Sequence, residues 1–287
     1  MKVEEILDFL SVIYPNDTSE EWDYPGLVVG SRSWDTTKVL YAVDITDQVV
    51  AEAIEKKCDL IISHHPLFFK SVHTVSDIGF RGAIVNKLVE NKIALYVGHT
   101  NVDKSVDGAS RVLAKELKLE NIVPIIPDFA NLDIGLGAAG DLPKAMSFEL
   151  FAKLVSSYLP QTPQGIKCSG DPNHAIKEVA IISGSGDFIF QNNYIPKTDV
   201  FISSDLRHHP VLDFRQANPN VCVIDVPHFS SEQICLQKIK EKVESKFASS
   251  SGLTGVISEK ITDPFNFVIN QSPEPTHSAD LKAPWDL

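Results

Sequence analysis

Cysteine is scarce in this sequence, and its four cysteines are widely separated. Cys58, Cys168, Cys222 and Cys235 form no CxxC pair, and three of them lie in apolar stretches. Disulfide frameworks belong mainly to short secreted chains, and structural zinc sites are usually dominated by cysteine thiolates. We therefore expect small buried thiols, and neither a disulfide scaffold nor a closed cysteine zinc site.

Long apolar runs are also lacking. No stretch approaches the roughly 18 consecutive apolar residues that a transmembrane helix requires. The opening residues, MKVEEILDFLSVIYP, mix acidic residues with apolar ones and lack the basic start and purely apolar centre of a signal peptide. We expect no membrane segment and a cytoplasmic location.

Basic residues are outnumbered by acidic ones. The chain of 287 residues has 26 Lys and Arg against 38 Asp and Glu, which gives a formal net charge of -12. Such a surface repels nucleic acid and anionic membranes over most of its area, so the charge argues against both as partners. With 43% hydrophobic residues, the chain has enough apolar side chains for one large core or two moderate ones.

The sequence contains an alternation of short apolar runs with segments of helical periodicity. Strands are expected at 38–44, 59–63 and 93–98, and helices at 3–13, 47–57, 78–92 and 107–118. This alternation is typical of a mostly parallel sheet with helices on its faces.

The amino-acid composition changes near residue 124, where Gly, Pro and Asp become frequent. A second unit is expected there, with a helix at 147–159 and strands near 165–169, 177–182 and 199–204. A strand at 221–226 and a helix at 230–246 resemble the first half and are expected to return to its sheet. The predicted fold class is α/β, with two interlinked α/β domains of mostly parallel or mixed sheets. Their expected extents are 1–123 with 221–268 for the metal-site domain, 124–220 for the second domain, and 269–287 for a loose tail.

Histidines and carboxylates follow several of the expected strands, at the positions where ligands collect in open α/β sheets. These residues are His64, His65, His99, Asp103, Asp205, His208, His209, His228 and Glu232. Imidazole and carboxylate bind zinc, manganese or iron, and two ions about 3.5–4 Å apart require at least four to six such groups. Pro66 can turn the chain so that His64 and His65 reach two neighbouring ions. His228 and Glu232 are four residues apart, which places them on one face of a helix.

Other interpretations of these residues stay open. A single His at a strand end is more often a hydrogen-bonded structural residue than a ligand, and the expected loop with Asp205, His208 and His209 fits an ordinary polar surface equally well. The stretch SGSGD at 183–187 either binds an anion or forms a tight turn between a strand and a helix. The turn is favoured, because the stretch lacks the Lys-Ser/Thr pair of a P-loop.

The motifs SHHPLFF, GHTNVD and HFSSE, in that order, resemble the Nif-three family (Ngg-interacting factor three), often labelled type 2 GTP cyclohydrolase I. EEWDYPGLVVG at 20–30, SSDLRHHP at 203–210 and the later TDPFNFV are similar too, so the resemblance covers about residues 1–268. It implies a two-domain α/β fold, a dinuclear metal site and a ring-shaped hexamer. Tyr24, Ser204 and Pro227 depart from the family pattern, where Asn, Gly and Gly are usual, but none of them is at a ligand position.

Carried over motif by motif, the resemblance implies two divalent ions, with zinc preferred over manganese or iron. The implied ligands are His64, His65, Asp103, His228 and Glu232. Glu232 is expected to bridge the ions, since one carboxylate can bind both. His99 is expected beside the metals as a supporting or substrate-binding group. Asp205, His208 and His209 are expected to move protons or to bind a leaving group.

These expectations favour a metal-dependent hydrolase that acts on a nucleotide or a related small molecule. A purine nucleotide opened at its ring, a phosphoester and an amidine-like bond all fit such ions, and no residue in these motifs is specific for guanine. The alternative is a metal-binding interaction or regulatory protein without catalysis, because the family is named after a protein partner. A purely structural metal site is disfavoured, since no cysteine lies in the ligand motifs.

Overall fold

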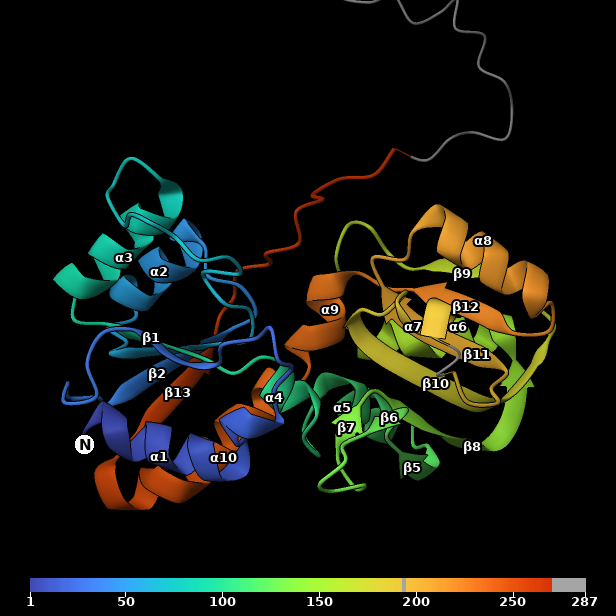
Figure 1. Cartoon of the computed structure of the whole chain (residues 1–287), viewed down its shortest axis with the longest axis horizontal. Helices are drawn as coiled ribbons and strands as arrows, with labels where there is room; N and C mark the ends of the chain where they lie inside the picture. Colours follow the sequence, from blue (N-terminus) through green and yellow to red (C-terminus); the bar gives the residue numbers. More distant parts are fainter. Residues whose placement is uncertain (193–194, 270–287) are drawn as a thin grey trace, which may run out of the picture.

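The computed structural model describes residues 1–192 and 195–269, which form two α/β halves side by side (Figure 1). The first half is built on a five-stranded sheet. In spatial order its strands are β1 (Gly26–Val29), β4 (Ala94–Val97), β3 (Leu60–Ser63), β2 (Lys38–Ala42) and β13 (Thr254–Ile257). β4, β3, β2 and β13 are parallel, and β1 is antiparallel to β4.

Helices cover both faces of this sheet (Figure 1). One face packs against α2 (Asp47–Glu55) and α3 (Phe80–Glu90), and the other against α1 (Val3–Ile13) and α10 (Leu236–Ser251). A short 3₁₀ helix, η1 (Asn16–Thr18), follows α1.

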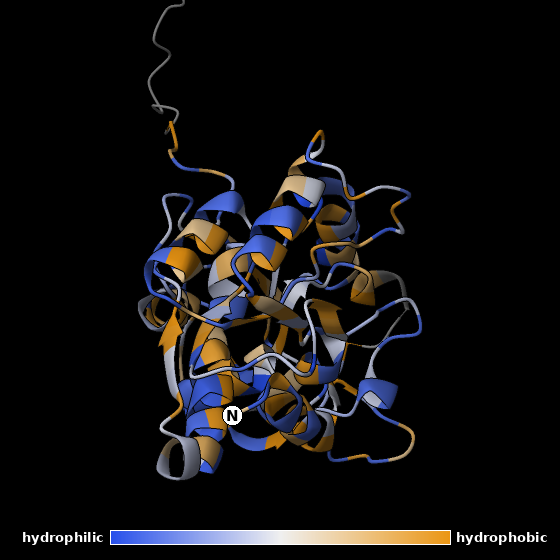
Figure 2. Cartoon of the chain, turned by 90° about the vertical axis from the view of Figure 1, so that its left-hand side faces the viewer, coloured by the Kyte–Doolittle hydropathy of each residue, from blue (hydrophilic) through white to orange (hydrophobic). Residues whose placement is uncertain are grey.

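Strand residues alternate between these two cores. Val39 and Tyr41 pack with α1 and α10, whereas Leu40 and Ala42 pack with α2 and α3. Successive side chains of a strand point to opposite faces, so a strand that is covered on both faces is apolar at every position. Figure 2 shows the result, with orange strands in the interior and helices that carry both blue and orange residues.

The second half is built on a six-stranded sheet. In spatial order its strands are β5 (Glu120–Val123), β8 (Ala138–Ser147), β10 (Ala175–Ser185), β11 (Val200–Ser204), β12 (Cys222–Asp225) and β9 (Lys167–Ser169). β10, β11 and β12 are parallel, and the outer pairings are antiparallel. The predicted α/β class with mixed sheets is therefore confirmed.

Helices also cover both faces of the second sheet. α5 (Ala109–Glu116) and α6 (Phe148–Tyr158) share one core with it, while α7 (Ile189–Asn192) and α8 (His208–Ala217) pack on the other side. A small pair of strands, β6 (Ile126–Pro127) and β7 (Gly135–Leu136), lies beside it. α4 (Thr100–Asp103) and α9 (His228–Gln233) lie where the halves meet (Figure 1).

The expected return of residues 221–226 to the first sheet is wrong. This segment contains β12, which pairs with β11 and β9 in the second sheet, and the chain returns to the first half only with α10 and β13. Similarly, α5 and β5 pack with the second sheet although they precede residue 124. A continuous apolar run fits the interior of either sheet, so periodicity alone cannot assign it to one of them.

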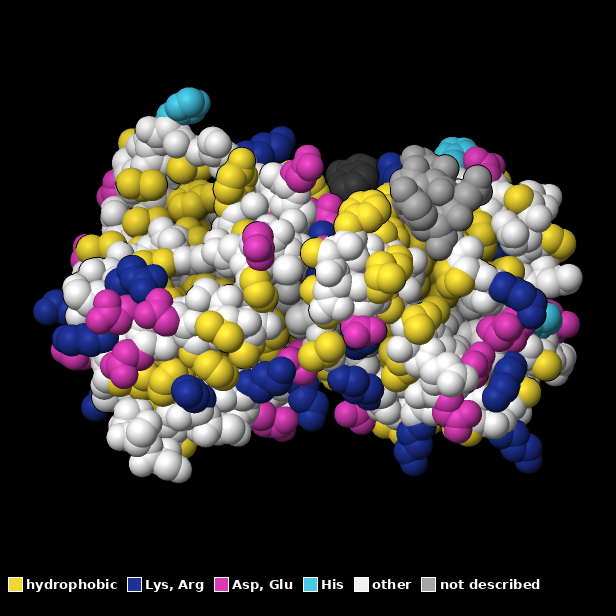
Figure 3. Space-filling view, turned by 60° about the horizontal axis from the view of Figure 1, so that its bottom comes forward, with side chains coloured by type: hydrophobic (Ala, Val, Ile, Leu, Met, Phe, Trp, Pro, Cys, Tyr) yellow, Lys and Arg dark blue, Asp and Glu magenta, His cyan; other side chains and the backbone are white. Residues whose placement is uncertain are grey.

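Several smaller expectations also have an outcome in the structure. Cys58, Cys222 and Cys235 are buried and Cys168 is exposed, and all four are free thiols. Among the described helices, none is both long enough and apolar enough to cross a bilayer. On the face shown in Figure 3, basic and acidic side chains are interspersed. The predicted tail lies outside the described residues from 270 onward.

The segment after β13, residues 258–265, contacts both halves and is called the C-terminal strap here. Ser258 Oγ and the backbone N–H of Glu259 donate hydrogen bonds to the buried carboxylate of Glu52, at 2.5 and 3.0 Å. Gln164 Nε2, from the second half, donates to both carboxylate oxygens of Asp263. The strap is therefore fixed to the first half by Glu52 and to the second by Gln164.

We expect Glu52→Ala to lower the free energy of unfolding by about 1.5–3 kcal/mol, because hydrogen bonds to a buried carboxylate are lost. Urea unfolding of the full chain measures this change. Glu259→Ala is the matched control, since this side chain is 79% exposed and its pairing with Lys56 contributes at most about 0.5–1 kcal/mol. Equal effects of the two substitutions would contradict the role given to Glu52.

Candidate metal centre

The carboxyl ends of the parallel strands in the two sheets face each other, and the predicted ligands meet there. His64 and His65 follow β3, and Asp103 is the last residue of α4, shortly after β4. His228 and Glu232 lie on α9, which follows β12 and packs against β10 and β11. The structure therefore brings these five residues, from both halves, into one cluster.

One group of potential ligand atoms consists of the Nε2 atoms of His65 and His228 and Oε2 of Glu232. The two nitrogens are 3.2 Å apart, and they lie 2.9 and 3.1 Å from the carboxylate oxygen. A tetrahedral zinc ion with bonds of about 2.1 Å keeps neighbouring ligand atoms about 3.4 Å apart. The spacing of this group therefore suits a metal ion.

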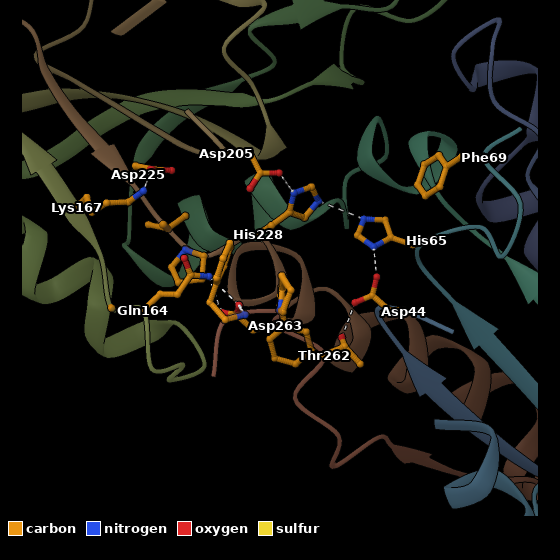
Figure 4. Close-up of a pocket in the computed structure, with 16 residues that line it drawn as sticks. Asp44, His65, Phe69, Gln164, Lys167, Asp205, Asp225, His228, Thr262 and Asp263 are labelled. Carbon is orange, nitrogen blue, oxygen red and sulfur yellow. Dashed lines mark hydrogen bonds and ion pairs between the residues drawn. The ribbon is translucent and has the colours of Figure 1, made fainter. Parts of the chain in front are cut away.

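The other ring nitrogen of each of these histidines is bonded to an aspartate. Nδ1 of His65 donates to Asp44 Oδ1 at 2.7 Å, and Nδ1 of His228 donates to Asp205 Oδ2 at 2.6 Å (Figure 4). A carboxylate accepts hydrogen bonds and cannot donate them, so in the neutral rings both Nε2 atoms carry lone pairs. Two lone pairs and a carboxylate oxygen at these distances repel one another unless a proton or a metal ion lies between them.

Glu232 presents its second oxygen, Oε1, to another group of atoms. Nε2 of His64 lies 3.5 Å from Oε1 and 3.7 Å from Oδ1 of Asp103. Nδ1 of His64 donates to the carbonyl oxygen of Gly98 at 3.1 Å, which leaves the lone pair on Nε2. His64 is fully buried, and its Nε2 has no hydrogen-bond partner among the described residues. Because an unpaired buried polar atom is costly, this position suits a proton attracted by the two carboxylates or a metal ion.

His99 lies beside both groups. Its ring centroid is 5.2 Å from that of His64 and 5.6 Å from that of His65, and the three residues form a set whose potential ligand atoms lie within 4.8 Å of one another. Nδ1 of His99 is 3.0 Å from Asp23 Oδ1, and Thr100 donates two hydrogen bonds to the other oxygen of Asp23. The nitrogen of His99 that remains available is therefore Nε2.

Charge at the site is concentrated on buried groups. Burial raises the pKa of Asp103 despite the nearby His64. Burial also opposes the charge on Glu232, but attraction to His65 and His64 outweighs it and keeps the pKa of Glu232 well below its usual range. Burial disfavours protonated His228 as well, yet hydrogen bonds to Asp205 and Glu232 raise its pKa to about 10. The cluster thus requires positive charge, which protons or a metal ion can supply.

Gly184, in the stretch SGSGD, makes room for the carboxylate of Glu232. Its φ is +72°, and a Cβ atom at this position would lie 2.3 Å from Glu232 Oε1. The backbone N–H of Gly184 donates to Ser231 Oγ at 3.0 Å, which fixes this turn against α9. The stretch ends β10 and leads into α7, so the favoured prediction of a strand-to-helix turn is confirmed.

Two cavities border the cluster. One has a volume of about 510 Å³ and is lined by His99 and by four cluster residues, namely His65, Asp103, His228 and Glu232. The other has a volume of about 390 Å³ and lies on the side of Asp44 and Asp205 (Figure 4). Both volumes fall within the range of small-molecule sites, about 300–1,000 Å³. The cluster is therefore accessible to a ligand.

Of the three residues expected to move protons, the structure places one at the cluster and two away from it. Asp205 accepts a hydrogen bond from His228, so it orients a potential metal ligand. His208 and His209 are exposed on α8, a helix where a loop was expected, and their rings contact each other. Neither lines the two cavities beside the cluster. A proton-transfer role for these two histidines remains a prediction that their position does not support.

Three residues that hold the histidines were not among the candidates from the sequence. Asp23 and Asp44 orient His99 and His65, and Thr262 of the C-terminal strap donates a hydrogen bond to Asp44 (Figure 4). Asp44 ends the predicted strand 38–44, so the rule that located the other site residues would also have found it. Asp23 and Thr262 follow no expected strand, although both lie in stretches that resemble the family.

Comparison with known proteins identifies the family of this chain. A model of the Duf34/NIF3 (NGG1p interacting factor 3) family matches residues 1–264. The chain belongs to this family. It is 34% identical over 275 residues to a protein of Streptomyces coelicolor named GTP cyclohydrolase 1 type 2 homolog, and the match covers 95% of this chain and 96% of that protein. The resemblance predicted from the motifs is thus confirmed.

Solved structures of relatives have the same fold as this NIF3-family chain. The crystal structure of a hypothetical protein of Staphylococcus aureus is 30% identical with a TM-score of 0.84, and the match covers 93% of this chain and 99% of that one. A protein of Methanocaldococcus jannaschii, described as reduced HcgD, is 28% identical with a TM-score of 0.74, covering 91% and 98%. The family fold therefore extends over both halves of the chain.

We expect Gly184→Ala to lower metal affinity at least tenfold, because the added methyl group displaces the Glu232 carboxylate. Gly252→Ala is the matched control, since Gly252 has a similar φ of +69° but no atom within 4 Å of its Cβ position. Titration with zinc, measured by isothermal calorimetry on both full-length variants, gives the comparison. If both substitutions weakened zinc binding equally, backbone strain and not the contact with Glu232 would be the cause.

A second prediction concerns the aspartate that orients His228. Asp205→Ala should weaken metal binding about 10–100-fold, the usual effect of removing the hydrogen-bond partner of a metal-bound histidine. Asp213→Ala, an exposed aspartate on α8, should leave affinity unchanged. Competition with a chromogenic zinc chelator measures both variants. Unchanged affinity in Asp205→Ala would show that His228 does not depend on this contact.

Proposed function

We propose that the cluster binds two divalent metal ions and that the chain is a metal-dependent hydrolase for a nucleotide or a related small molecule. His64, Asp103 and Oε1 of Glu232 are the proposed ligands of one ion. His65, His228 and Oε2 of Glu232 are the proposed ligands of the other. The observation that carries the proposal is the set of lone-pair atoms that face one another, among them the unpaired buried Nε2 of His64.

Zinc is the preferred metal in this proposal, and manganese and iron also suit histidine and carboxylate ligands. Each ion has only three proposed protein ligands, which is the number found at catalytic sites that keep a position open. Bound paired ions would lower the pKa of a water molecule and polarise a substrate oxygen. The chain itself supplies the ligand positions and the cavity of about 510 Å³.

His99 is the group that we propose transfers protons. Its Nδ1 lies next to Asp23, whose pKa is lowered to about 2 because contacts with His99 and Thr100 outweigh the effect of burial. The ring is therefore held by a permanent anion, and Nε2 remains available on the side of the cavity that His99 lines. This arrangement suits a general base or acid.

We also propose that the chain forms a homo-oligomer, a ring-shaped hexamer, and that it acts in the cytoplasm. Support for the assembly comes from large apolar side chains on the segment between β3 and α3 and on the first residue of α3. Val72, Val75, Ile78 and Phe80 are 45–95% exposed. Large contiguous apolar patches on protein surfaces often mark interaction sites, and these side chains lie close together in the sequence.

The metal stoichiometry of single variants tests the proposed function. We expect two ions per chain in the wild type, one in His64→Ala, one in His65→Ala and none in Glu232→Ala, because Glu232 serves both ions. His73→Ala, an exposed histidine between β3 and α3, is the control and should retain both ions. Elemental analysis of purified protein gives these numbers. If His64→Ala and His65→Ala each bound no ion, the two histidines would share a single ion.

Hydrolysis is tested on the same proteins with a screen of nucleotides, phosphoesters and cyclic amidines. Activity should require metal, disappear with chelator and return when zinc is added. Bound metal without turnover of any compound would instead favour a metal-binding interaction protein.

A further inference from the structure

The cavity of about 510 Å³ has walls whose chemistry differs from that of the metal cluster at its base. Beside the cluster residues it is lined by five large apolar side chains, namely Trp22, Phe69, Leu136, Ile182 and Phe188. Apolar walls around a few polar groups are typical of small-molecule sites, in which the polar groups orient the ligand and the walls bind its body. The chemistry of the walls therefore indicates the chemistry of the part of the substrate that does not react.

The aromatic side chains of this cavity are available to a ligand. Trp22 and Phe69 are 59% and 58% exposed, and Phe188 is 36% exposed. The rings of Trp22 and Phe69 both lie 5.8 Å from the ring of His99, at interplanar angles of 72° and 83°. Neither ring is stacked on the imidazole, and more than half of the surface of each residue is exposed. Both rings can therefore contact a planar group next to His99.

The same cavity offers no Lys or Arg side chain to a phosphate chain. Among its lining residues there is no Lys or Arg, and Glu20, Asp103 and Glu232 are acidic. Lys104 lies close by, but its Nζ is 2.7 Å from Glu20 Oε1 and its side chain is only 15% exposed. A ligand anion that extends beyond the metal cluster would therefore meet carboxylates.

The second cavity does not provide a phosphate site either. Its one Lys or Arg among the lining residues is Lys167, whose Nζ is 2.5 Å from Asp225 Oδ2 (Figure 4). Asp44, Asp205 and Asp263 also line it. Sites for polyphosphates usually present Arg, Lys or backbone N–H groups to the oxygens. Apart from the histidines of the site and any bound metal, acidic side chains thus outnumber basic ones in both spaces.

We propose that the substrate of this site is an uncharged planar ring compound, with its ring against Trp22 and Phe69 and one polar group at the metal cluster. A triphosphate contributes nothing to its binding. This inference rests on the proposed function, because it assumes that the cluster is the reactive centre. It specifies which part of a nucleotide-like molecule the chain recognises.

Calorimetry on the zinc-loaded full-length chain tests the inference with neutral nucleosides, their triphosphates and inorganic tripolyphosphate. We expect guanosine, adenosine or uridine to bind at least as tightly as the corresponding triphosphate, and tripolyphosphate to bind at least tenfold more weakly. Trp22→Ala and Phe69→Ala should each weaken nucleoside binding about tenfold, since base–aromatic stacking is worth about 1–3 kcal/mol per base.

Two controls separate ring recognition from other effects. Phe129→Ala removes a fully exposed aromatic residue that lines neither cavity and should bind nucleosides like the wild type. Trp22→Phe keeps an aromatic face and should retain most of the affinity. Elemental analysis of each variant must show unchanged metal content, so that a loss of binding is not a loss of metal.

The inference is overturned if no neutral nucleoside binds, if a triphosphate binds at least tenfold tighter than its nucleoside, or if Trp22→Ala and Phe69→Ala bind like the wild type. Its failure is distinct from failure of the proposed function. Nucleoside binding that depends on Trp22, without hydrolysis of any compound, would refute the hydrolase and leave the recognition of a ring intact. Metal-dependent hydrolysis with no dependence on Trp22 or Phe69 would support the hydrolase and refute the recognition of a ring.

Discussion

The arrangement of the site depends on three electronegative atoms that face one another and need positive charge between them. Nε2 of His65, Nε2 of His228 and Oε2 of Glu232 lie 2.9–3.2 Å apart, and Nδ1 of each histidine donates to an aspartate on the outer side. Such a cluster is stable in a buried position only with positive charge inside it. The aspartates that fix the rings and the glycine that admits the carboxylate are all arranged around this requirement.

Much of the site was predictable from the sequence, because many of its residues lie at the ends of strands that the local sequence pattern marks. The strands at 38–44, 59–63 and 93–98 are apolar at nearly every position, and the polar residues that follow them are the site residues. The rule that strand ends carry function needs only those boundaries. The same rule would have found Asp44, which ends the strand at 38–44. Thr262 lies on an irregular segment that no periodicity marks.

What the sequence did not predict is mostly long-range pairing. β13 is a four-residue strand with a glycine, and its place beside β2 depends on contacts across more than 200 residues. β12 joins the second sheet because α8 connects it to β11, and α8 was not expected as a helix. Short strands and weakly amphipathic helices acquire their structure from tertiary packing, which one sequence does not display.

The proposed ligands come from both halves of the chain, and this origin has a thermodynamic consequence. Asp103 and His64 belong to the first half, while Glu232 lies on a helix packed against the second sheet. An ion that binds only the assembled pair stabilises it by mass action, by about 2.7 kcal/mol when the free ion is at a hundredfold excess over its dissociation constant. If the cluster binds metal as proposed, metal supply and the cohesion of the two sheets form one linked equilibrium, and removal of the ion would lower the stability of the protein.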